Sequence, residues 1–115
     1  MYCRIKKNTE FKKLFTRGRR RFSAAIILLY MPAQRTSLGV CVSKKHGKSV
    51  KRNRIKRLLR EAFRMVYGRM EKSCAVVLIP KEAETYTLAA FEKSLVSAMR
   101  REGLISDHGK SAKGG

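Results

Sequence analysis

The cationic side chains between Lys44 and Arg60 have the chemistry and the spacing of a phosphate-binding surface. The 50 positions between Glu10 and Glu61 contain sixteen Lys and Arg residues and no acidic residue. Such a surface repels itself unless a polyanion supplies the missing negative charge. We therefore expect this half of the chain to bind phosphate. Nine of the sixteen cations are Lys44, Lys45, Lys48, Lys51, Arg52, Arg54, Lys56, Arg57 and Arg60.

Several of these cations stand where a helix begins. The apolar spacing predicts a long helix over about Val50–Tyr67, with Ser49 as its cap. Cations in a first helical turn are unfavourable by about 0.3–1 kcal/mol each, but a bound phosphate turns this penalty into an attraction. A solvated basic helix face is the alternative interpretation. The exclusion of acids and the concentration of charge at one helix end argue against that alternative.

No residue pattern indicates catalysis by the protein itself. We find no carboxylate pair, no Cys–His pair and no Ser–His–Asp arrangement, and we predict no catalytic residue. The cysteines are Cys3, Cys41 and Cys74, without a C-x-x-C pair and far from His46 and His108. We therefore expect neither a disulfide framework nor a metal site. Cys41 and Cys74 are predicted as small core residues, and Cys3 as a surface thiol.

Composition bounds the size and the partners of the protein. The 115 residues suffice for one domain, 1–115, and the hydrophobic fraction of 43% is that of a globular chain. A formal net charge of +20 makes nucleic acid the first partner to consider and an acidic membrane the second. We find no signal peptide, and the apolar run Ala24–Met31 is too short to span a bilayer. We therefore expect a cytoplasmic protein.

The predicted elements alternate between helices and strands. The helices pack on one side of a small sheet, which gives an α+β architecture whose other sheet face needs a different cover, a ligand being one candidate. Residues 1–8 are predicted to be flexible, 8–103 to form the ordered core and 104–115 a flexible tail. Gly68 and Gly103 are predicted helix stops. The elements are a helix from Glu10 to Gly18, a linking run Arg19–Arg21, strands Phe22–Met31, Ser37–Ser43 and Cys74–Ile79, the long helix, and a last helix at about Leu88–Arg101.

The stretch Ser43–Arg64, SKKHGKSVKRNRIKRLLREAFR, carries a family resemblance. It resembles the signature of the bacterial ribonuclease P protein component, in which a strand ending in S-K-K precedes R-N-R-I-K-R-L-x-R-E-x-F on a helix. The F-x-x-x-F helix at Phe11 and Phe15 and the order of the other elements agree, so the resemblance covers about 8–103.

The resemblance implies which residues bind RNA. The family's catalytic RNA cuts the 5′ leader from precursor tRNA with bound Mg²⁺, while the protein binds RNA and improves substrate and metal affinity. The implied cofactor is thus Mg²⁺ in the RNA-containing holoenzyme and none on the protein alone, and no membrane or obligate protein partner is implied. The residues implied to contact the catalytic RNA are Lys44, Lys45, Lys48, Lys51, Arg52, Asn53, Arg54, Lys56, Arg57 and Arg60.

A second set of residues is implied to line a cleft for the single-stranded leader. Aromatic rings stack on any base, which suits this task. On pattern alone, however, Phe11 and Phe15 are more typical of core residues. The family also places an aromatic residue on the sheet, for which Tyr30 and Leu29 are alternatives. The implied leader cleft comprises Phe11, Lys12, Phe15, Arg17 and Tyr30.

The implied fold is an αβββαβα sandwich with a left-handed βαβ crossover, ribosomal protein S5 domain 2-like, with an extra strand within Arg19–Ala25. Two other functions are consistent with charge and size. A structural RNA-binding protein, such as a ribosomal protein, is distinguished by the Arg52–Phe63 signature. A membrane-active amphipathic protein is disfavoured because the apolar face of the long helix is needed for the core.

Overall fold

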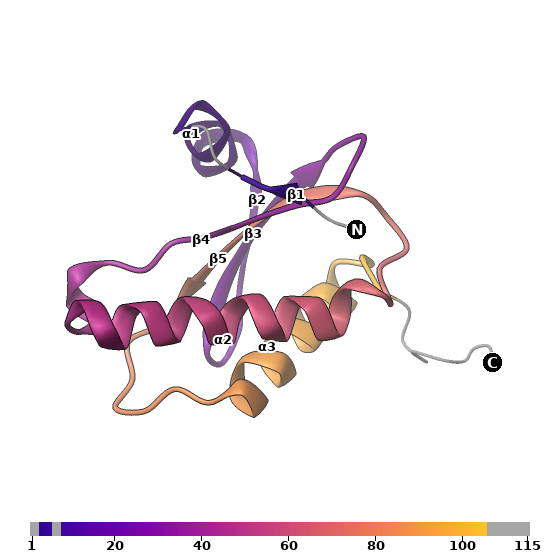
Figure 1. Cartoon of the computed structure of the whole chain (residues 1–115). Helices are drawn as coiled ribbons and strands as arrows, with labels where there is room; N and C mark the ends of the chain where they lie inside the picture. Colours follow the sequence, from indigo (N-terminus) through magenta and orange to yellow (C-terminus); the bar gives the residue numbers. More distant parts are fainter. Residues whose placement is uncertain (1–2, 6–7, 106–115) are drawn as a thin grey trace.

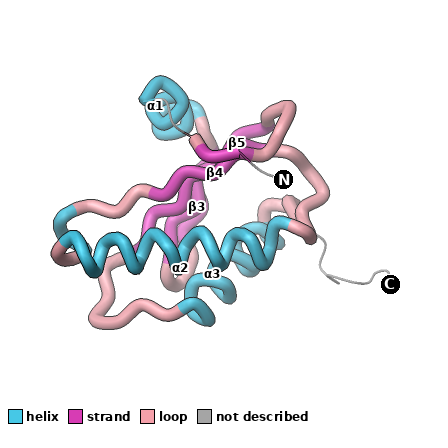
Figure 2. Tube along the Cα trace, in the orientation of Figure 1, coloured by secondary structure: helices cyan, strands magenta, loops and turns pink. Residues whose placement is uncertain are grey.

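The computed structural model describes residues 3–5 and 8–105, and a mixed five-stranded β-sheet runs through its centre. Helix α1 lies on one face of the sheet, and α2 and α3 lie on the other (Figures 1 and 2). In chain order the elements are β1 (Cys3–Arg4), α1 (Asn8–Arg17), β2 (Arg19–Phe22), β3 (Ile26–Pro32), β4 (Ser37–Val40), the 3-10 helix η1 (Lys44–His46), α2 (Ser49–Tyr67), β5 (Cys74–Pro80) and α3 (Leu88–Arg101).

The strand order is β1–β4–β5–β3–β2. Strands β4 and β5 pair in parallel, and α2 supplies the long crossover that a parallel pair requires. Strand β1 is also parallel to β4, whereas β3 is antiparallel to both β5 and β2. The predicted α+β class and its order of helices and strands are confirmed, and β1 adds a two-residue strand at the edge.

The larger hydrophobic cluster lies between the sheet and helices α2 and α3. The predicted apolar stripe of α2 packs here, with Leu59 and Phe63 completely buried. Alternate residues of the central strands meet it, because successive side chains on a strand point to opposite faces. The strand residues on this face are Ile26, Leu28, Tyr30, Leu38, Cys74, Val76 and Leu78.

A smaller cluster occupies the opposite face and holds α1. Leu14 of α1 is buried there together with Leu29 of β3 and Val77 of β5. Ile5, which follows β1, joins the same cluster. The face that was predicted to need a different cover is therefore partly covered by α1.

The two predicted helix stops differ in conformation. Gly103 after α3 has φ +74°, the left-handed conformation that favours glycine. Gly68 directly follows the last residue of α2, so the predicted stop is confirmed, but its φ of −64° is helical rather than left-handed. A Cβ at Gly68 would have no neighbour within 4 Å, and no close approach requires a glycine there either.

Three predicted irregular segments are ordered instead. The run Arg19–Arg21 is not a link but belongs to β2, which confirms an extra strand within Arg19–Ala25. Residues 3–5 pair with β4 rather than being flexible, since the Ile5 N–H donates to the Leu38 carbonyl at 2.9 Å. Leu104 and Ile105 are buried, so the core extends beyond 103. The remainder of the predicted tail, 106–115, lies outside the described residues.

One carboxylate joins β2, β3 and the end of α3. Glu102 accepts hydrogen bonds from the Tyr30 hydroxyl and from the Arg21 guanidinium, and its side chain is only 6% exposed. The hydrogen bond from Tyr30, followed by those from Arg21, lowers the pKa of Glu102. Burial and the bond to Glu102 raise the pKa of Tyr30 to about 12. The charged carboxylate and the neutral phenol are therefore the forms that stabilise the fold.

Glu102→Gln should lower the free energy of unfolding at pH 7 by about 1–3 kcal/mol, because it removes a buried charge-assisted hydrogen-bond acceptor. Since the pKa of Glu102 is lowered on folding, its contribution is present above the ordinary pKa of about 4.5 and is lost as pH falls through the folded value. Urea unfolding at pH 7 and at pH 3 measures both effects. Glu61→Gln is the matched control, because Glu61 pairs with Arg64 at the protein surface, where an ion pair contributes little stability. Equal losses in the two variants would contradict a special role for Glu102.

Candidate nucleic-acid interface

Helix α2 presents its cations from an uncapped N-terminus. Its first turn has no acidic residue, and Lys48 stands at the N-cap without a side-chain capping bond among the described residues. The predicted cap by Ser49 is therefore wrong. The N–H groups of the first turn and the surrounding cations can hold an anion together. Lys51, Asn53, Arg54 and Arg57 are exposed, and Arg52, Lys56 and Arg60 are half-buried.

The loop before α2 is held by His46, a buried residue that the sequence did not single out for this role. The Ser43 N–H donates to His46 Nδ1 at 3.0 Å, and Nε2, which then carries the proton, donates to the Pro80 carbonyl at 2.9 Å. These bonds tie η1 to the end of β5. The exposed Lys44 and Lys45 are thereby placed beside the start of α2, as predicted. A single histidine has no spacing pattern from which this role could have been predicted.

The two aromatic residues of α1, Phe11 and Phe15, differ in how far they are buried. Leu14 supplies the buried contact with the sheet, whereas Phe15 remains 38% exposed. Phe11 is half-buried, and its ring lies directly on the backbone of Gly39, where an added Cβ would be 2.7 Å away. Gly39 thus makes room for the ring. The other predicted leader-cleft residues of this helix, Lys12 and Arg17, are exposed.

The structure does not bring Tyr30 together with Phe11 and Phe15. Tyr30 points to the face covered by α3, where its hydroxyl binds Glu102, and it is 6% exposed. The alternative, Leu29, is on the α1 face but is completely buried there. The prediction of Tyr30 in the leader cleft is therefore wrong about the face of the sheet. The apolar run Ala24–Met31 is continuous, so its pattern does not indicate which side chains point toward α1.

A different aromatic residue of the sheet occupies the α1 face. Directly paired residues of antiparallel strands point to the same side, and Phe22 of β2 pairs with Ile27, two residues before Leu29. Phe22 therefore shares the face of Leu29 and α1. Its side chain is 56% exposed. The sequence placed Phe22 at the start of a strand but gave no indication of this exposure.

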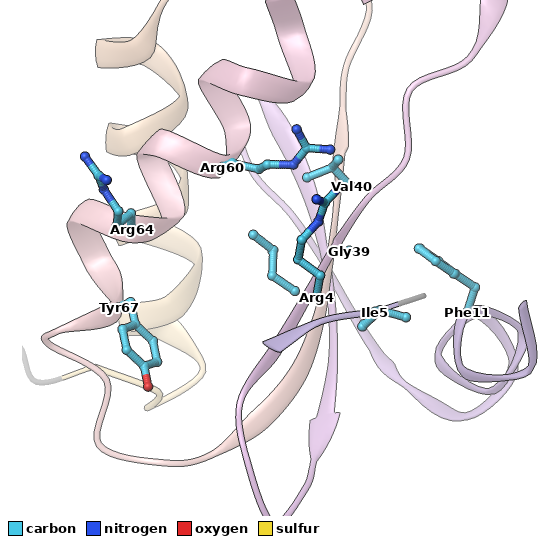
Figure 3. Close-up of a pocket in the computed structure, with 9 residues that line it drawn as sticks. Arg4, Ile5, Phe11, Gly39, Val40, Arg60, Arg64 and Tyr67 are labelled. Carbon is cyan, nitrogen blue, oxygen red and sulfur yellow. The ribbon is translucent and has the colours of Figure 1, made fainter. Parts of the chain in front are cut away.

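A cavity of about 430 Å³ lies between α2 and the edge formed by β1 and β4. Arg4 and Arg60 extend toward Val40 within it, and Phe11 approaches from the other side of β4 (Figure 3). Arg64 and Tyr67 complete the wall on the α2 side. The cavity thus joins one predicted residue from each RNA-binding set, Phe11 and Arg60. Its apolar walls and arginines suit a base and its phosphate.

Acidic side chains are too dispersed to form a metal centre in the described part of the chain. Residues 3–5 and 8–105 contain no group of three or more His, Cys, Asp or Glu side chains that could hold a metal ion. Over the same residues, no helix combines the length and the apolar character required to cross a membrane. What these surfaces offer chemically is cations, amides and aromatic rings, which are groups that bind nucleic acid.

Comparison with known proteins identifies the family. The ribonuclease P family model matches residues 2–103. The chain belongs to the ribonuclease P protein family. The ribonuclease P protein component of Clostridium kluyveri is 40% identical over 107 residues, covering 88% of this chain and 95% of the relative. That of Caldanaerobacter subterraneus subsp. tengcongensis is 40% identical over 91 residues, covering 74% and 78%.

Solved ribonuclease P proteins have the same fold. The Staphylococcus aureus protein superposes with a TM-score of 0.79 at 25% identity, covering 92% of this chain and all of that one. The Thermotoga maritima protein gives 0.76 at 26% identity, covering 85% and 96%. The ribonuclease P resemblance predicted from Ser43–Arg64 is confirmed.

Proposed function

We propose that this ribonuclease P protein component binds the catalytic RNA of ribonuclease P and the 5′ leader of precursor tRNA, and so assists endonucleolytic removal of the leader. The observation that carries the proposal is the position of the family signature on the exposed, uncapped N-terminal half of α2. The segment Lys44–Arg60 carries nine cations and no acidic residue. Glu82, which pairs with Lys45, and Glu84 lie beside it and offset only part of this charge, so a polyanion is needed to neutralise the rest. We place this activity in the cytoplasm.

The proposed anchor to the catalytic RNA is η1 together with the N-terminal half of α2. Arg52, Arg54 and Arg57 offer planar forks that match phosphate, and Asn53 offers both a donor and an acceptor. His46 keeps the lysines of η1 beside them. The protein would position RNA through these contacts without making or breaking a bond.

The proposed leader surface is the α1 face of the sheet. Phe15 offers an exposed ring, and Phe11 lies next to the cavity that reaches Arg60. Leu14 holds α1 on the sheet, so these rings keep a constant position relative to α2. The two RNAs would thus bind opposite layers of one small domain, and the fold sets the distance between them.

Mg²⁺ is assigned to the RNA in this proposal. Mg²⁺ takes oxygen ligands, preferentially carboxylates and phosphates, and the segment Lys44–Arg60 contains no carboxylate. The protein's contribution is to bring phosphate groups together, and the phosphate oxygens can then hold the ions. The improvement in metal affinity follows from this arrangement of phosphates rather than from protein ligands.

Reconstitution tests the proposed function. Added to a ribonuclease P RNA at low Mg²⁺, the protein should restore leader cleavage of a precursor tRNA without any other protein, because its cations offset the repulsion between the two RNAs. Gel analysis of end-labelled precursor measures the rate. Protein freed of RNA should cut nothing. Cleavage by the protein alone, or no stimulation at low Mg²⁺, would contradict the proposal.

A further inference from the structure

Phe22 combines exposure with a neighbouring cation. At 56% exposure it is the most exposed phenylalanine of the described residues, ahead of Phe15 at 38%. The ammonium group of Lys81 lies 5.7 Å from the centre of its ring. A solvent-facing ring beside a cation is the arrangement on which single-stranded nucleic acids stack. Core packing does not explain why a phenylalanine stands at this position, since its ring is outside both hydrophobic clusters.

Phe22 stands at the end of the α1 face that α1 leaves uncovered. Leu29 and Val77 are completely buried under α1. Ile27, two residues before Leu29, and Ile79, two residues after Val77, are only half-buried. Ile27 and Ile79 pair with each other, and Ile27 pairs with Phe22. The sheet surface next to α1 is therefore less covered in the direction of Phe22. Two residues of a strand span about 7 Å, so the position of Ile27 lies about this far from that of Leu29 along β3.

A groove of about 640 Å³ continues from this point between the β2–β3 turn and α3. Phe22, Lys81, Lys93 and Arg101 line it, and the remaining walls are alanine and serine residues of the turn and of α3. No carboxylate is among the lining residues. Small neutral walls with cations along them fit a phosphate backbone, and the exposed ring of Phe22 adds a surface on which a base can stack.

We propose that Phe22, Lys81 and this groove bind the 5′-distal nucleotides of the precursor tRNA leader, beyond those that contact Phe11 and Phe15. A base stacks on Phe22, and the backbone continues past Lys93 and Arg101. This inference rests on the proposed function, because it extends the leader surface from the α1 face at Phe22, past the β2–β3 turn, to α3 on the other side of the sheet. Its consequence is a dependence on leader length, since a short leader ends before it reaches Phe22.

The test compares precursor tRNAs with leaders of about four and about sixteen nucleotides, the range of site sizes found for single-strand binding. In the reconstituted holoenzyme, Phe22→Ala should raise Kd for the long leader about fivefold, the lower end of one stacked base, and leave the short leader unchanged. Phe22→Tyr keeps the ring and should restore binding. Met65→Ala, which removes another exposed apolar side chain on α2, is the matched control. Circular dichroism confirms that each variant is folded.

A second measurement needs no substitution. Photoreactive nucleotides placed along the long leader should cross-link to the β2–β3 turn or to α3 only from distal positions. Equal effects of Phe22→Ala on both leaders, no effect on either, or cross-links to this groove from the catalytic RNA or from a protein in place of the leader would overturn the inference. Phe15→Ala on the short leader reports on the proposed function separately, so the two can fail independently.

Discussion

The double variant Arg52→Ala, Arg54→Ala should bind the catalytic RNA at least about a hundredfold more weakly, while its fold is retained. Each charge-assisted hydrogen bond to phosphate contributes about 1.5–3 kcal/mol, so the loss of two such contacts accounts for a change of this size. The plot of log K against log salt should become shallower by about one unit per arginine removed. Filter binding over a series of salt concentrations measures both the affinity and the slope.

Two companion variants separate specific contacts from bulk attraction. Arg35→Ala removes a charge at the turn between β3 and β4, at the opposite end of β4 from η1, and should change the affinity and the slope much less. Arg52→Lys keeps the charge but not the planar fork, so it should preserve the slope and still lose affinity. If Arg35→Ala weakened binding as much as Arg52→Ala, the helix start would not be the anchor.

The helices and the central strands could be predicted because their packing repeats at a regular period. The apolar stripe of α2 and the bounds Leu88–Arg101 of α3 follow from a spacing that only a helix satisfies. Gly103 as a stop follows from its backbone freedom, and its φ of +74° confirms this. The family signature on α2 could be predicted for a different reason, because a specific motif carries more information than any periodicity.

The edge strands could not be predicted from local sequence patterns, because their pairing partners decide them. The extra strand within Arg19–Ala25, which is β2, is expected only from the family resemblance. Strand β2 consists of Arg19–Arg21 and Phe22, all exposed, and nothing in three consecutive arginines indicates a strand. Strand β1 has two residues, too few for an alternation pattern. Both are formed by hydrogen bonds to a neighbouring strand. Strand β1 pairs with β4, far along the chain, and β2 pairs with β3 across a short turn.

Which residues lie on the α1 face of the sheet also depends on strand pairing, which the sequence does not reveal. A continuous apolar run such as Ile26–Tyr30 is buried on both sides, so sequence cannot tell which side chain meets α1. The pairing of Phe22 with Ile27 assigns Phe22 to that face. Tyr30, three residues after Ile27 on the same strand, points to the other face and belongs to the larger cluster. The role of His46 could not be predicted, because its partners are backbone groups, the Ser43 amide and the Pro80 carbonyl. Backbone groups occur at nearly every position and leave no sequence pattern.

Leu14→Ala and Phe15→Ala should have opposite consequences, although the residues are adjacent on α1. Leu14 is 1% exposed, and its truncation should cost about 2–5 kcal/mol of unfolding free energy, a large part of the total stability of a small domain. Phe15 is 38% exposed, so Phe15→Ala should cost less than about 1 kcal/mol. Its effect should fall on leader binding, where one lost stacking contact weakens affinity about fivefold or more. Urea unfolding and a binding titration with short-leader precursor tRNA measure the two quantities.

The pair of variants decides between the two interpretations that the F-x-x-x-F pattern allows. If both aromatic residues served the core, Phe15→Ala would lose stability on the scale of Leu14→Ala, and its loss of leader affinity would disappear once the unfolded fraction was accounted for. If Phe15 binds the leader, Phe15→Ala lowers leader affinity although the protein is fully folded. Phe15→Tyr then restores affinity because the ring is retained. The exposure of Phe15 beside a fully buried Leu14 favours the second outcome, since the sheet already has its contact with α1 through Leu14.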